Sequence, residues 1–152
     1  MNRRPPAVWL LIALQFLLGL GALAGGGMLI AAPDGSRLGM PLSMLQYSPF
    51  RDFLIPGLIL FTVLGVFPVF VAYSLWQRPA WRWLEALNPA RRKHWSWAAS
   101  LFAGIILLLW ITFQVLLIRS IVLIHILYLV WGWVLIALTL TADVRLHYSR
   151  SS

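Results

Sequence analysis

Long apolar segments alternate with short polar segments along this chain. The longest apolar run extends from Trp95 to Ala142, and its only permanently charged side chain, Arg119, lies near its middle. One helix needs about 20 residues to cross the hydrocarbon core of a bilayer, and a charge at the centre of that core is costly. The run therefore predicts two membrane helices joined by a tight turn at Arg119-Ser120.

Two further apolar segments precede that run. Residues 7–32 carry one strongly polar side chain, Gln15, and residues 53–76 carry no charge. A basic start before an apolar segment is also found in signal peptides, but this segment exceeds their usual apolar core of about 7–15 residues, which favours a retained helix. The predicted fold is all-α: one polytopic membrane domain over residues 1–152, with four transmembrane helices in an antiparallel bundle. The predicted spans are residues 7–32, 53–76, 95–118 and 121–142.

Glycine and proline mark special positions within two of these spans. Gly21 and Gly25 form a small-xxx-small pair, which permits close approach of a second helix. Since glycine is a poor helix former, the same glycines are equally consistent with a loosened helix end. Pro68, in the second span, lacks a backbone donor and its ring clashes with the preceding turn, so we expect a kink there.

The first polar loop, residues 33–52, contains three local signals. Pro33-Asp34-Gly35 predicts a turn, because proline presets φ, aspartate bonds to the following backbone and glycine adopts positive φ. Residues 41–46 predict a short helix at the membrane interface. Ser48-Pro49 has the residue types of a helix start, with Ser48 as the N-cap.

Charge gives the predicted bundle an orientation. The chain has 12 Lys+Arg against 4 Asp+Glu, a net charge of +8. With four spans, nine basic residues lie on the side of the termini and three on the other, and the basic side faces the cytoplasm. The three outer residues are Arg37, Arg51 and Arg119. The nine inner residues are Arg3, Arg4, Arg78, Arg82, Arg91, Arg92, Lys93, Arg145 and Arg150. We therefore expect both termini to be cytoplasmic, in a plasma (inner) membrane, with residues 33–52 as the outer loop.

The basic cytoplasmic loop, residues 77–94, has two predicted features. Residues 81–87 mix apolar and charged side chains and predict a short interfacial helix. Five basic side chains are candidates for contact with anionic lipid, although the simpler interpretation is that they only determine topology. These residues are Arg78, Arg82, Arg91, Arg92 and Lys93.

Composition argues against a soluble domain and against a nucleic-acid-binding protein. Hydrophobic residues make up 61% of the chain and charged residues 11%, whereas soluble domains average about 25% charged. A water-facing fold of this size could not hide so much apolar surface. Because the basic residues lie beside apolar spans, we expect a bilayer partner and no nucleic acid, with a homo-oligomer or a larger membrane complex also compatible.

Several segments carry a resemblance to a known group of proteins. They are residues 38–41, 48–50, 52–57 and 94–97, then Trp110-Ile111 with Gln114, and Val144-Arg145 before Tyr148. On these residues the chain resembles small uncharacterised bacterial four-helix integral membrane proteins. The resemblance implies four spans in a bacterial inner membrane and implies no activity. Ala142-Asp143 departs from it, because a proline is expected before Val144.

The chain offers little recognisable chemistry. It has no cysteine, and its three histidines are far apart in sequence. Nucleotide, metal and serine-hydrolase motifs are absent from the sequence, so we expect no catalytic residue, no metal and no cofactor. All four acidic residues lie at loops or span ends, so the deep carboxylate of a coupled transporter is missing too.

One polar constellation remains, near the outer ends of the last three spans. Gln114 precedes Arg119 by five residues and His125 follows it by six, so both are expected roughly 7–9 Å below the turn. Tyr128 shares a helix face with His125, and Asp52 lies at a similar level. These five residues predict an outward-opening polar pocket between helices. The alternative is that Gln114 and His125 only hydrogen-bond across the hairpin.

Three tryptophans in the last two spans lie deeper than the others. They are Trp110, Trp131 and Trp133, and they are predicted to pack between helices.

Three functional hypotheses follow, in this order. The first is a non-enzymatic protein that binds a lipid, quinone or apolar small molecule, or serves as an accessory subunit. The second is a small transporter or channel, which needs an oligomer because few polar residues line any one face. The third is an enzyme acting on lipid at the outer leaflet, with His125 as acid/base and Arg119 holding phosphate, but it lacks an evident nucleophile.

Overall fold

The computed structural model describes residues 3–150, in which four long helical segments account for most of the chain. They are α1 (Pro6–Ala31), a continuous segment formed by α2 (Leu54–Ile59), η3 (Leu60–Val66) and α3 (Phe67–Gln77), then α5 (Trp95–Ile118) and α6 (Leu123–Leu140). Each segment is long and apolar enough to cross a membrane, which confirms the all-α prediction with four candidate spans. The helix ends differ from the predicted ends by no more than two residues.

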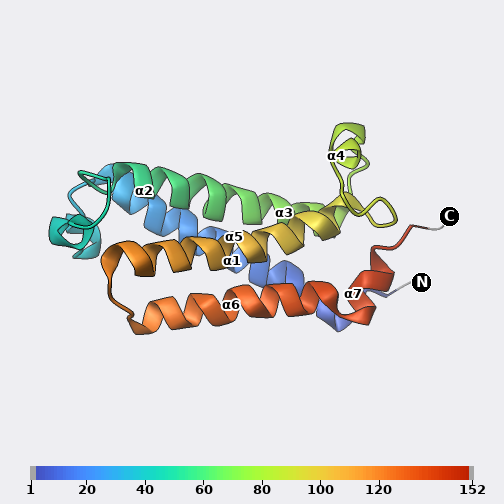
Figure 1. Cartoon of the computed structure of the whole chain (residues 1–152). Helices are drawn as coiled ribbons and strands as arrows, with labels where there is room; N and C mark the ends of the chain where they lie inside the picture. Colours follow the sequence, from blue (N-terminus) through green and yellow to red (C-terminus); the bar gives the residue numbers. More distant parts are fainter. Residues whose placement is uncertain (1–2, 151–152) are drawn as a thin grey trace.

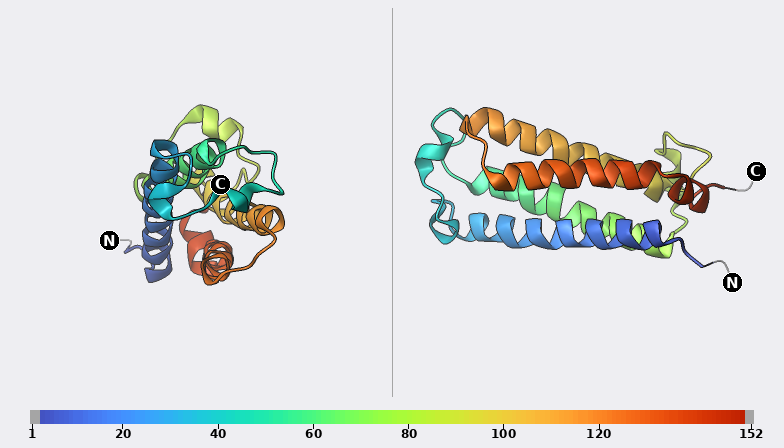
Figure 2. Two further views of the ribbon diagram at one scale, coloured as in Figure 1. Left: turned by 90° about the vertical axis from the view of Figure 1, so that its left-hand side faces the viewer. Right: turned by 90° about the horizontal axis from the view of Figure 1, so that it is seen from below.

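The long segments lie side by side, and the connections gather at two ends (Figures 1 and 2). The hairpin end holds the first loop, with η1 (Ser36–Leu38) and η2 (Leu42–Leu45), and the turn between α5 and α6. The terminal end holds the start of α1, the second loop with α4 (Arg82–Ala86), and α7 (Ala142–His147). Both short helices predicted in the loops are therefore present, the first as a 3-10 helix.

Two glycines of α1 form its closest contact with the second span. A Cβ built at Gly26 would lie 2.6 Å from the Phe61 backbone nitrogen, and one at Gly19 would lie 2.8 Å from the Gly65 carbonyl oxygen. A Cβ at Gly21 or Gly25 would meet nothing closer than 3.6 Å. The predicted close approach is thus present, but it uses Gly19 and Gly26 instead of the pair Gly21 and Gly25.

Glycines also bring α5 and α6 together. A Cβ at Gly104 would lie 2.8 Å from Ile136 Cγ1, and one at Gly132 would lie 2.7 Å from Leu108 Cδ2. Because α6 makes most of its helix contacts with α5 and fewer with α1, this crossing holds α6 on the bundle.

The second span departs from α-helical geometry directly before Pro68. Residues Leu60–Val66 form a π-helical segment, and the Phe67 N–H donates to the Thr62 carbonyl, five residues back. Proline and π-turns are the common causes of helix kinks. The predicted kink at Pro68 stays a prediction, and the π-helical segment places a second cause of bending beside it.

The first loop folds down onto the helices through an apolar cluster. Leu29, Leu45 and Phe53 are buried together, and the Phe53 N–H donates to the Pro33 carbonyl oxygen at 2.8 Å. Gly35 adopts φ 79°, as the predicted turn requires. The loop is therefore anchored at both of its ends and at its centre.

Ser48 does not begin a helix, contrary to the sequence prediction. Its hydroxyl donates to the Leu45 carbonyl and accepts from the Phe50 N–H, which makes a local turn. The helix begins at Leu54 instead, where the Asp52 carboxylate accepts the Leu54 N–H at 2.9 Å. Asp52 is a better acceptor at a helix start than the Ser48 hydroxyl, because a carboxylate near a helix N-terminus is also favoured by the helix dipole.

Candidate functional site

A narrow apolar crevice lies at the hairpin end, between α1, the second span, α5 and the first loop. Its volume is about 40 Å³. The lining residues are Leu29, Met40, Leu45, Phe50, Phe53, Pro56, Leu60, Trp110, Phe113, Gln114, Leu117 and Ile118. Gln114 is thus the one predicted pocket residue among them, and residues of the first loop form one wall of the crevice.

Two polar groups belong to this otherwise apolar lining. Gln114 contributes a carboxamide, and Trp110 contributes an indole N–H. The Trp110 Nε1 atom is buried and has no hydrogen-bond partner within residues 3–150. An unmade bond of this kind is costly in hydrocarbon, because no water is present to replace it. A residue that lines the crevice therefore carries an unpaired donor of the kind that binds a carbonyl or ether oxygen.

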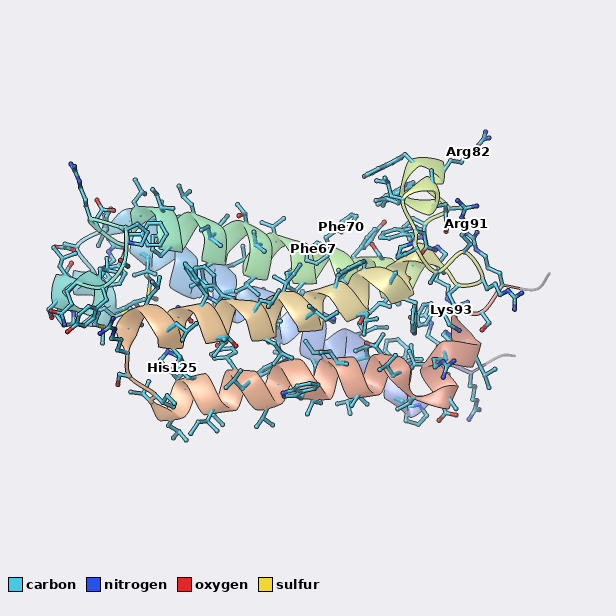
Figure 3. The ribbon with its side chains drawn as sticks, viewed as in Figure 1. Phe67, Phe70, Arg82, Arg91, Lys93 and His125 are labelled. Atoms are coloured by element: carbon cyan, nitrogen blue, oxygen red, sulfur yellow. The ribbon has the colours of Figure 1, made fainter. Side chains whose placement is uncertain are left out.

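The other four predicted pocket residues lie outside the crevice lining and make contacts with nearby groups instead. Asp52 accepts the Leu54 N–H at the start of α2, as described above. Arg119 ends α5 at φ 54° and places its guanidinium carbon 4.2 Å from the centre of the Tyr47 ring. His125 is 7% exposed and lies in the first turn of α6 (Figure 3). Tyr128 stacks on Trp131, with 6.0 Å between ring centres.

His125 holds the beginning of α6. The His125 ring Nδ1 accepts the Val122 backbone N–H at 3.2 Å, and the His125 backbone N–H donates to the Val122 carbonyl at 2.9 Å. This reciprocal pair satisfies groups that a helix start leaves open, so it is favourable inside a bilayer. The structure gives His125 this partner and not Gln114, the partner expected across the hairpin.

The deeper tryptophans differ in burial. Trp110 and Trp131 are half-buried, and their indole N–H groups have no partner in the described part of the chain. Trp133 is 63% exposed on α6, so the prediction that it packs between helices is wrong within this chain.

The five basic residues predicted to contact lipid divide into two groups. Arg78 donates to the His147 carbonyl at 2.8 Å, and Lys93 Nζ donates to the Arg145 carbonyl at 3.2 Å. Arg82, Arg91 and Arg92 are exposed, and Figure 3 shows Arg82 and Arg91 pointing away from the helices. Arg78 and Lys93 thus make contacts within the chain, whereas the side chains of the other three are exposed.

Sequence reasoning missed a buried polar cluster that links three helices. Gln15 Nε2 donates to the Ser100 hydroxyl at 3.1 Å, and that hydroxyl bonds to the Thr139 hydroxyl at 3.0 Å. The Trp97 indole N–H donates to the Thr139 carbonyl at 2.8 Å. Bonds of this kind between membrane helices average about 0.6 kcal/mol. Gln15 was visible as the sole strongly polar residue of its span, but its partners are common hydroxyl residues that give no signal.

These features are those of a multi-pass membrane protein, with four helices long and apolar enough to cross a membrane and an apolar crevice at one end. Comparison with protein-family models, with curated proteins and with solved structures gave no match to this chain. The resemblance to bacterial four-helix membrane proteins therefore stays a prediction from the sequence. Within residues 3–150, no three His, Cys, Asp or Glu side chains are grouped to hold a metal.

Proposed function

We propose that this chain is a non-enzymatic integral membrane protein that binds the apolar part of a lipid or small molecule in the crevice at the hairpin end. The observation that supports the proposal is Trp110, which lines the apolar crevice and whose buried indole N–H has no partner in the described residues. Apolar walls with one or two placed polar groups are typical of small-molecule sites. The preferred ligand carries a hydrocarbon chain and a hydrogen-bond acceptor.

Ligand entry requires a small movement of the first loop. The crevice volume of about 40 Å³ is close to the roughly 30 Å³ share of one water molecule. Met40 lines the crevice, and Met44 packs on the same apolar cluster. Methionine side chains rearrange easily, because they are unbranched and have three rotatable bonds. Displacing them opens the crevice without unfolding a helix.

The polar residues at the hairpin end support binding over catalysis. His125 uses Nδ1 to hold the start of α6, and Arg119 lies over Tyr47. A lipid-cleaving mechanism needs a base and an anion-binding group that converge on one substrate atom. These two residues instead serve separate local contacts, so the binding hypothesis ranks above the enzymatic one.

Filling the crevice is expected to remove its ligand. The chain is purified in nanodiscs made from native membrane, and molecules enriched over the bulk lipid are identified by mass spectrometry. Leu117→Trp places a large side chain in the lining and is expected to abolish the enrichment. Trp110→Phe removes one donor worth about 1 kcal/mol and is expected to reduce it about fivefold.

Leu109→Trp is the matched control, because Leu109 lies on the same helix and is 64% exposed. It is expected to retain the ligand. Equal enrichment in Leu117→Trp and Leu109→Trp, or no enrichment over bulk lipid in the unchanged chain, contradicts the proposed function.

The proposal includes an antiparallel arrangement with both termini in the cytoplasm, supported by the nine-to-three division of basic residues. Since the chain has no native cysteine, single cysteines report the orientation cleanly. Ser36→Cys is expected to react with an impermeant maleimide added to intact cells. Ala90→Cys is expected to react only after lysis. The reverse pattern contradicts the orientation, and labelling of both variants in intact cells contradicts the number of spans.

A further inference from the structure

Three separate segments meet at the terminal end, around the last turn of α3. Arg78 follows that turn with φ 51°, a left-handed conformation that is rare for a residue with a side chain. Its guanidinium donates to the His147 carbonyl at 2.8 Å and lies 4.7 Å from the centre of the Tyr148 ring. The unusual backbone conformation thus directs a long basic side chain onto the residues at the end of α7.

The segment before α1 brings a second cation to the same place. Arg4 donates to the Trp76 carbonyl oxygen, and the Tyr148 hydroxyl donates to the Leu75 carbonyl oxygen at 2.6 Å. Both carbonyls belong to the last turn of α3, which has no further helical donors. Arg4, Arg78 and the pair His147-Tyr148 are therefore fixed around one helix end.

No carboxylate within residues 3–150 acts on His147 or Tyr148 to offset the positive charges of Arg4 and Arg78. Burial and the charges of Arg78 and Arg4 lower the pKa of His147 to about 4, and no acidic group opposes them. The pKa of Tyr148 is raised to about 12 by burial, although Arg78 and Arg4 oppose that shift. Glu85, the acid of the second loop, forms its ion pair with Arg150 instead.

Two buried nitrogens at this place have open hydrogen-bonding capacity. Arg78 Nε and His147 Nε2 are both enclosed and have no partner within residues 3–150. A guanidinium with an unused N–H beside an imidazole can bind a phosphate oxygen directly. The position also fits, because Arg4 precedes the first span and Arg78 follows the second, at the level of lipid headgroups.

We propose that Arg4, Arg78 and His147 form a binding site for a phosphate group, supplied by the headgroup of an anionic phospholipid. The guanidinium groups hold the phosphate, and His147 Nε2 completes the site. This site lies at the end opposite the crevice and does not depend on the ligand of the crevice. It also differs from contact with the exposed Arg82, Arg91 and Arg92, which have no enclosed partner group.

Titration of His147 reports occupancy. A bound phosphate brings negative charge beside the imidazole and partly cancels the effect of Arg4 and Arg78, so the pKa of His147 rises from about 4 towards its ordinary value. His94, at the same end, is the internal reference: burial is the main cause of its lowered pKa, Arg78 also lowers it, and Arg4 is not among the causes. A general negative surface potential raises both pKa values alike, whereas an occupied site raises that of His147 more, because both Arg78 and Arg4 act on His147 and only Arg78 acts on His94.

The experiment uses the full chain with isotope-labelled histidine in maltoside micelles, which contain no phosphate. The pKa of each histidine is measured by NMR before and after addition of phosphatidylglycerol, oleate or inorganic phosphate. We expect phosphatidylglycerol to raise the pKa of His147 by one unit or more, with a smaller rise at His94, and oleate to have no selective effect. A selective shift with inorganic phosphate alone supports the phosphate chemistry but contradicts the lipid source.

Variants separate the site from general charge. Arg4→Gln and Arg78→Gln each remove one phosphate contact, and both are expected to abolish the selective shift. Arg91→Gln is the matched control with the same charge change on an exposed residue, and it is expected to keep the shift. If Arg78→Gln does not fold, Arg4→Gln decides the result. No selective shift in the unchanged chain, or an equal shift in Arg4→Gln, overturns the proposal.

Discussion

Alanine in place of Gly26 is expected to weaken the packing of α1 on the second span by about 1–3 kcal/mol. The new Cβ would lie 2.6 Å from the Phe61 nitrogen and 2.9 Å from the Gly57 carbonyl oxygen. These neighbours are backbone atoms, which cannot turn aside as a flexible side chain can. The two helices must therefore separate, and the packing contacts along the rest of their interface weaken as well. Reversible unfolding in mixed micelles of maltoside and dodecyl sulfate, followed by circular dichroism, measures the loss.

Gly27→Ala provides a control of opposite sign from the adjacent residue. A Cβ there would meet nothing closer than 3.9 Å. Since alanine is a better helix former than glycine, we expect no change or a gain of about 0.5–1 kcal/mol. Equal effects of Gly26→Ala and Gly27→Ala contradict the close contact, because helix propensity alone cannot distinguish the two positions.

Tyr148→Ala is expected to have the largest effect of any single truncation at the terminal end, about 3–5 kcal/mol. The Tyr148 side chain is 1% exposed, and its ring lies beneath the Arg78 guanidinium. Truncation removes the buried ring, leaves a cavity, and frees the Leu75 carbonyl and Arg78 at the same time. The same unfolding measurement reads the change.

Two further substitutions divide that effect into parts. Tyr148→Phe keeps the ring and loses the bond to Leu75, so it is expected to cost about 1–3 kcal/mol, the range for an unsatisfied buried carbonyl. Tyr73→Ala truncates a tyrosine that is 48% exposed, and we expect a much smaller change. If Tyr148→Ala costs no more than Tyr73→Ala, then Tyr148 does not anchor the terminal end.

The number and limits of the spans could be predicted because they depend on length and polarity, which are read directly along the chain. The sequence could not predict which face of each helix packs against its neighbours. α1 is apolar on all sides, so its sequence lacks the polar stripe that would mark the lipid-facing or bundle-facing side. The glycine pair was therefore assigned by spacing to Gly21 and Gly25, whereas the rotation of α1 presents Gly19 and Gly26 to the second span.

The same limit explains why only one of the five residues predicted for the polar pocket lines the crevice. Counting residues from Arg119 gave the depths of Gln114 and His125, but spacing along a hairpin contains no information about the rotation of each helix. Gln114 turned towards the first loop, and His125 was taken up by the backbone of Val122. Asp52 was placed at the correct end, and its role as a cap was masked by the competing signal at Ser48-Pro49.

The pairing of residues 92–94 with residues 148–150 has a consequence for biosynthesis. The His94 N–H donates to the Tyr148 carbonyl, and the Arg150 N–H donates to the Arg92 carbonyl. The ribosome makes Arg150 58 residues after Arg92, an interval of roughly 3–12 seconds at ordinary elongation rates. During that time residues 92–94 lack their backbone partners in residues 148–150, because α5 and α6 are still being made. These backbone bonds therefore form only after α5 and α6 have both been made, so the terminal end closes last.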